Sequence, residues 1–152
     1  MATSTLLQKL DSGATFGGAT SHRRQVETFI AAGVITAGDV VMWSIDGTAD
    51  SVLKVAKSAL KALGQGLACG VALNSATADQ RVDVVTSGFV AANCAADTGT
   101  IVAGDILVAS VVTAGEVELR VVADLARPFG VALEAADATT TDFVNICVYP
   151  QF

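Results

Sequence analysis

The sequence predicts an all-β protein: a single barrel-like or sandwich-like domain made of two pseudo-repeats, with an extended N-terminal arm. The first observation is composition, since 52% of the 152 residues are hydrophobic, only 16% are charged and the chain is rich in Ala, Val and Gly. Small apolar side chains with few charges are typical of packed strands rather than of a charged helical bundle. The second observation is a series of short apolar runs separated by turn signals, and the third is an internal repeat.

The first 32 residues are expected to form the arm. Residues 11–21 are mostly Gly, Ser, Thr and Ala and follow neither a period of 2 nor one of 3.6. Residues 1–30 hold three bases against two acids, a balance of +1. Because the net charge of the whole chain is −6, the remaining residues carry −7. Leu6, Leu7 and Leu10 have the spacing of one amphipathic helical turn that could bind a partner, and a frayed terminus is the alternative.

Residues 33–152 are expected to form the β domain, with pseudo-repeats at about 35–90 and 101–152. Ile35-Thr-Ala-Gly-Asp-Val-Val41 matches Ile101-Val-Ala-Gly-Asp-Ile-Leu107, and Gly70-Val-Ala-Leu73 is identical to Gly130-Val-Ala-Leu133. The two offsets are 66 and 60 residues, so the first copy has six extra residues between the landmarks. An insertion at this place predicts a longer loop in the first copy.

Each copy predicts the same order of elements. Ala-Gly-Asp is a turn signal, because Gly tolerates a positive φ and Asp can hydrogen-bond backbone N–H groups just beyond it. Four strands per copy follow, and Gly and Ala of Gly-Val-Ala-Leu permit a close approach of a neighbouring strand. One segment is less clear, because Lys54, Lys57 and Lys61 have helical spacing. There the strand is expected to run to about Val55, and a short helix or loop could follow it. The expected strands are 40–45, 51–55, 70–73 and 81–86 in the first copy, and 106–110, 116–122, 130–133 and 143–149 in the second.

The residues that could carry chemistry favour a protein that is not an enzyme and binds no metal or cofactor. His22 is the only histidine and lies in the expected arm, so neither a catalytic triad nor a histidine-rich zinc site is expected. Asp39 and Asp105 occupy equivalent turns, and turn chemistry explains them. A small hydrolase that uses these two carboxylates as a catalytic pair is one alternative function of the chain. The remaining candidates are expected to pack in the core, namely Cys69, Cys94, Cys147, Trp43, Phe89, Phe129, Phe143 and Tyr149.

Charge and hydropathy also limit the partners. The acidic body disfavours nucleic acid. The longest charge-free stretch, residues 62–78, is interrupted by three glycines and several polar residues, so no membrane span is expected. The N-terminus lacks a basic start followed by an apolar run, which predicts a chain without a signal peptide that is made in a cytoplasm.

The pattern resembles the small decoration, or cement, proteins of tailed-bacteriophage capsids. The residues that carry the resemblance are Ala-Gly-Asp-Val-Val, Gly-Val-Ala-Leu and the strand from Val82 to Val90, followed by Gly130-Val-Ala-Leu-Glu-Ala-Ala-Asp137. The resemblance covers about residues 33–152 and rests on short β motifs.

The resemblance implies a homotrimer that binds the major capsid protein on the exterior of the expanded shell, near local threefold positions, and stabilises it. It also implies that the N-terminal segment reaches the shell and that no catalytic or cofactor residue carries over. A receptor-binding or fibre-knob module displayed on a virion is the alternative. The residues expected to bind the capsid are Leu6, Leu7, Lys9, Leu10, Phe16, Arg23 and Arg24.

Overall fold

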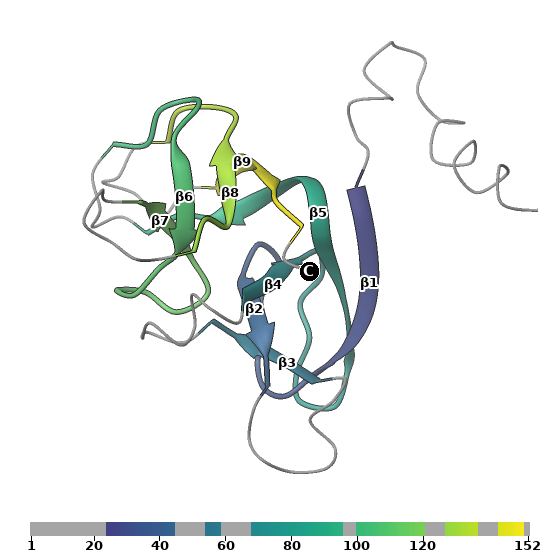
Figure 1. Cartoon of the computed structure of the whole chain (residues 1–152). Coiled ribbons are helices and arrows are strands. Elements are labelled where there is room, and N and C mark those ends of the chain that lie inside the picture. Colours follow the sequence, from purple (N-terminus) through teal and green to yellow (C-terminus); the bar gives the residue numbers. More distant parts are fainter. Residues whose placement is uncertain are drawn as a thin grey trace, which may run out of the picture.

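The computed structural model describes residues 24–44, 54–58, 68–95, 100–120, 127–136 and 143–150. These residues form nine β-strands, which confirms the predicted all-β class (Figure 1). The described part of the chain contains no helix that is long and apolar enough to cross a membrane. The strands are β1 (Arg24–Ala31), β2 (Val40–Trp43), β3 (Lys54–Lys57), β4 (Ala68–Ala72), β5 (Arg81–Asn93), β6 (Ile106–Ala109), β7 (Val117–Leu119), β8 (Gly130–Ala132) and β9 (Phe143–Val148).

The first five strands close into a barrel in the order β1-β3-β2-β4-β5. All neighbours are antiparallel except β1 and β3, which pair in parallel through Ile30 with Lys54 and Ala31 with Val55. The ring closes where β1 pairs with the first half of β5. Closure leaves no unpaired edge between these strands.

The second half repeats this ring with β9, β8, β6 and β7. The second half of β5 pairs with β9, from Gly88 opposite Val148 to Asn93 opposite Phe143. A single parallel bridge between Cys94 and Val117 closes the second ring, at the place where β1 meets β3 in the first. The 13-residue strand β5 therefore belongs to both barrels and joins them.

The cores explain why the two barrels form one body. Alternating side chains of β2, β4 and β5 point in opposite directions, so Val41, Cys69 and Val84 fill the first barrel while Val40 and Val85 join the core of the second. The side of the first barrel formed by β2, β4 and β5 is thus part of the second core.

Backbone hydrogen bonds confirm the pseudo-repeat in detail. Gly38 and Gly104 have φ values of 90° and 96°, as the third residue of a type II turn requires. Each turn also donates its glycine N–H to the equivalent strand, to the Ala72 carbonyl at 2.8 Å in the first copy and to the Ala132 carbonyl at 2.8 Å in the second. The side chain of Asp39 accepts the N–H of Thr36, which lies three residues before it, whereas the sequence predicted a hydrogen bond to N–H groups just beyond the Asp.

Three boundaries differ from the sequence-based expectation. The arm was expected to extend to residue 32, but Arg24–Ala31 is strand β1, because the side chains of Phe29 and Ala31 fill the first barrel. Residues 1–23 lie outside the described residues. The helical alternative is wrong for Lys54–Lys57, which is β3, whereas Lys61 lies outside the described residues. Strand β5 runs seven residues beyond the expected end at residue 86.

Candidate functional site

The outer face of the second barrel carries a continuous row of apolar side chains. Ile106 of β6 is paired with Val131 of β8, Val131 with Cys147 of β9, and Cys147 with Phe89 of β5. Residues opposite one another on adjacent strands share a face, so these four side chains lie in one row. Leu133, two residues after Val131, adds to the same face. We call these five residues the outer face.

The outer face is open to solvent. The side chains of Ile106 and Leu133 are 41% and 44% exposed, and Val131, Cys147 and Phe89 are half-buried. Contiguous exposed apolar side chains on a sheet mark an interaction surface more often than isolated ones do.

The repeat supplies a counterpart of this face on the first barrel, where most of it is covered. Three members of the equivalent row, Val40, Val71 and Val85, are paired across β2, β4 and β5 in the same way and are fully buried. The fourth member, Val26 of β1, pairs with Val85 as Phe89 pairs with Cys147, and it is 42% exposed. Leu73, the counterpart of Leu133, is half-buried and packs against the second core. The second barrel itself therefore covers most of this counterpart.

Three parts of the second barrel make the covering contact. The Asn93 backbone N–H donates to the Gly38 carbonyl at 2.8 Å, and the Val40 N–H donates to the Gly115 carbonyl at 2.7 Å. The Phe143 ring lies so close that a Cβ on Gly38 would come within 2.6 Å of it. Asp39 completes the contact, since its Oδ1 accepts from the Asn93 amide at 3.0 Å.

Asp39 is the most strongly held carboxylate of this contact. Its side chain is 3% exposed and forms an ion pair with Lys57 at 2.9 Å. Asp105, its repeat counterpart, is more exposed, and its side chain accepts the Val102 N–H at 2.8 Å. Both side chains thus stabilise their turns, as the sequence indicated, but through an N–H that precedes the Asp, and they do so in different surroundings.

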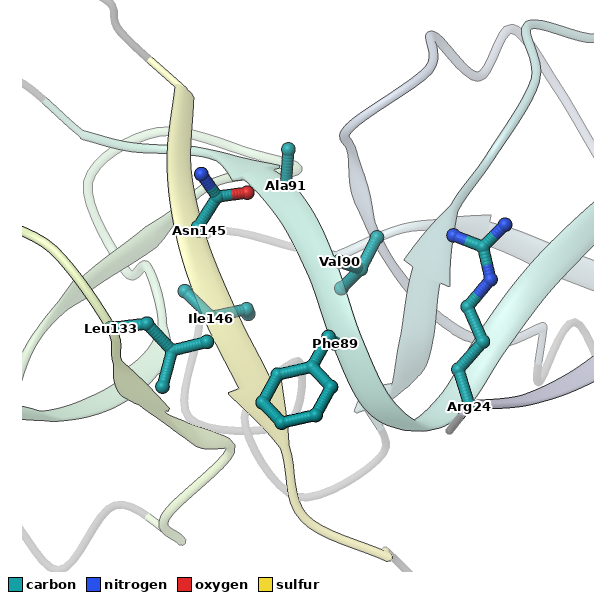
Figure 2. A pocket seen from close by; sticks show the side chains of 7 residues that line it. All are labelled: Arg24, Phe89, Val90, Ala91, Leu133, Asn145 and Ile146. Atoms are coloured by element: carbon teal, nitrogen blue, oxygen red, sulfur yellow. The ribbon is translucent and has the colours of Figure 1, made fainter. Parts of the chain in front are cut away.

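A groove of about 430 Å³ opens on the outer face. Figure 2 shows Leu133 and Phe89 on either side of the β9 ribbon, with Arg24 at the far side of β5. Besides Arg24, the groove has one polar lining residue, Asn145, whose side-chain and backbone N–H groups both donate to Glu134, at 2.8 and 3.0 Å. The lining residues are Arg24, Phe89, Val90, Ala91, Leu133, Asn145 and Ile146.

Only one of the residues expected to bind the capsid is described. Arg24 is exposed at the start of β1 and lines the groove. The other six, Leu6, Leu7, Lys9, Leu10, Phe16 and Arg23, lie outside the described residues. The chain therefore enters the first barrel beside the groove on the second.

The expectation that the aromatic side chains pack in the core is wrong for three of them. Phe143 and Tyr149 are 60% and 38% exposed and Phe89 is half-buried on the outer face, whereas Phe129 is buried. Val144, Ile146 and Val148 fill the barrel, so alternation directs Phe143 and Cys147 outward. The same alternation in the sequence could have assigned Phe143 to the outside.

The cysteines behave mostly as expected. Cys69 and Cys94 are buried free thiols, whereas Cys147 is half-buried on the outer face. Burial raises the pKa of Cys69 to about 12, so its thiol stays protonated at neutral pH. Among the described residues, no three side chains of His, Cys, Asp or Glu gather in a way that could hold a metal ion.

The fold is similar to that of a solved phage protein. The head fiber gp8.5 N base in bacteriophage phi29 matches with a TM-score of 0.55 and 17% sequence identity, over 84% of this chain and 96% of that chain. At this identity the likeness shows a shared fold. No protein-family model and no curated protein sequence matches the chain.

Proposed function

We propose that this chain is a structural protein of a tailed-phage virion that binds the outside of the capsid. The observation that carries the proposal is the fold shared with the base of a phage head fiber, over nearly the whole length of that base. The decoration-protein motifs support it independently, since they come from the sequence alone. In this role the protein is a trimer that binds near local threefold positions and stabilises the expanded shell, which requires no catalysis.

The physical basis of such stabilisation is mass action. A protein that binds only the assembled shell stabilises that state by an amount that grows with its concentration over its dissociation constant. A standard interface buries about 800 Å² on each partner, so one small domain is large enough to bridge neighbouring capsid subunits.

We further propose that the N-terminal residues bind the shell. Arg24 supports this role, because it is exposed and marks the point at which the preceding residues join the barrel. Leu6, Leu7, Leu10 and Phe16 would supply apolar contacts, and Lys9, Arg23 and Arg24 would pair with carboxylates. The basic balance of residues 1–30 against an acidic body favours an acidic patch as the target.

The test is co-sedimentation of the purified full chain with expanded shells of its own virus that lack it. We expect saturable binding at a fixed ratio of copies to the major capsid protein. Leu6→Asp with Leu10→Asp should abolish binding, and Arg24→Glu should weaken it more at low than at high salt. Arg127→Glu reverses an exposed arginine elsewhere and is the matched control. Absence of saturable binding by the wild-type chain would refute the proposal.

The fibre-knob alternative makes a different prediction. A receptor-binding module would bind cell-surface glycans or whole host cells and would not saturate bare shells. The same purified chain on a glycan array therefore separates the two functions.

A further inference from the structure

The repeat places the same local structure at two sites, of which one is covered and one is open. A Cβ on Gly38 would meet Phe143 at 2.6 Å, whereas a Cβ on Gly104 would meet nothing within 4 Å. Val40 is fully buried, and its counterpart Ile106 is 41% exposed. The open site has the backbone geometry of a surface that, in the first copy, holds a neighbouring barrel.

The residues that do the covering also have counterparts. Asn93 and Phe143 are opposite each other at one end of the second barrel, and Ile30 and Arg81 are opposite each other at the equivalent end of the first. Arg81 is exposed there. The first barrel thus presents a rim equivalent to the one by which the second barrel covers Gly38.

We propose that the outer face binds the first barrel of a second copy of this chain, through the rim at Ile30 and Arg81. The contact would repeat between chains the arrangement that the second barrel makes within one chain. Ile30 would take the position of Asn93 and Arg81 that of Phe143, over Gly104.

Charge complementarity supports this occupant. Phe143 lies over Gly38, the residue directly before Asp39, so Arg81 in the position of Phe143 would lie over Gly104, the residue directly before the Asp105 carboxylate. A guanidinium and a carboxylate form a charge-assisted pair, so a cation on the rim suits this face. Ile106 and Leu133 would lose their exposed apolar area in the same contact.

The contact is head to tail, because the face and the rim belong to different barrels. Head-to-tail contacts close into a ring when the rotation between copies permits it. The proposed trimer would be such a ring. The contact itself follows from the repeat and does not depend on binding to a capsid, so it is tested with the protein alone.

The first experiment measures the mass of the full chain in solution by light scattering and sedimentation velocity over a range of concentrations. We expect the wild-type chain to form a discrete oligomer, and Ile106→Asp, Leu133→Asp and Arg81→Glu each to weaken association by about tenfold or more. Val112→Asp, at a side chain of similar exposure (47%) outside the outer face, is the matched control. Thermal unfolding of each variant verifies that it is folded.

Mixing two variants tests the head-to-tail geometry. Ile106→Asp retains an intact rim and Arg81→Glu an intact face. At a concentration at which each variant alone is monomeric, an equimolar mixture should therefore form heterodimers. A face-to-face dimer would be insensitive to Arg81→Glu and would give no heterodimer. A monomeric wild-type chain, an oligomer unaffected by Ile106→Asp, or a mixture without heterodimers would each overturn the proposal. Loss of shell binding with the oligomer intact would instead count against the proposed function.

Discussion

Asp39 and Asp105 are identical in the repeat and differ in their surroundings, so replacing each with Ala gives a quantitative test. Asp39→Ala removes three interactions: with the Thr36 N–H at 2.7 Å, the Asn93 amide at 3.0 Å and the Lys57 ammonium at 2.9 Å. Removing one partner of a buried ion pair costs about 3–5 kcal/mol. Lys57 is 35% exposed and can reach water, which favours the lower end, about 3 kcal/mol.

Asp105→Ala removes one hydrogen bond, from the Val102 N–H, at a more exposed position. Its expected cost is about 1 kcal/mol. The difference of about 2 kcal/mol corresponds to a Tm lower by about 4–8 °C for Asp39→Ala in a chain of this size.

Calorimetry and urea unfolding at neutral pH measure both variants. Equal losses of stability in the two variants would mean that burial of Asp39 between the barrels contributes nothing, contrary to this prediction.

Two further predictions concern the first barrel. Gly70→Ala should lower the free energy of unfolding, measured in urea, by about 3 kcal/mol or more, because its Cβ would lie 2.3 Å from the Val85 carbonyl oxygen. Gly33→Ala is the control, since its Cβ would meet nothing within 4 Å, and it should be neutral or slightly stabilising. Equal effects of the two substitutions would contradict the close approach of Val85 to Gly70. Since burial raises the pKa of Cys69 from 9.0 to about 12, the unfolded chain loses this proton first as the pH rises above 9.0, and stability falls by about 1.4 kcal/mol per pH unit until the folded thiol ionises. Cys69→Ala should show a correspondingly shallower loss of stability between pH 9.0 and 12, and an unchanged slope would contradict this assignment.

Local sequence signals predicted most of the strands. Ala-Gly-Asp forms the last three residues of both four-residue type II turns. It marks them because the positive φ of the Gly and the hydrogen bond from a backbone N–H to the Asp carboxylate both arise within the turn itself. The identity of Gly70–Leu73 and Gly130–Leu133 likewise predicted equivalent strands, β4 and β8, each approached closely by the next strand.

Strand β1 shows where local signals were insufficient. Arg24–Ala31 presents mostly polar side chains outward, and only Phe29 and Ala31 are buried within it. Its place in the fold depends on pairing with β5, more than fifty residues later in the chain, and such long-range pairing has no signature within the segment.

The all-β class, the two copies and their turns could be predicted from the sequence, since each depends on residues that are close along the chain or on comparison of one copy with the other. Two features emerge only from the folded molecule: one long strand belongs to both barrels, and the second barrel covers the first copy's Asp39 and Val40 while Asp105 and Ile106 remain open. Neither could be predicted, because burial depends on which barrel lies next to a residue. Two equal segments can therefore fold alike and still differ in stability, exposure and the partners they can bind.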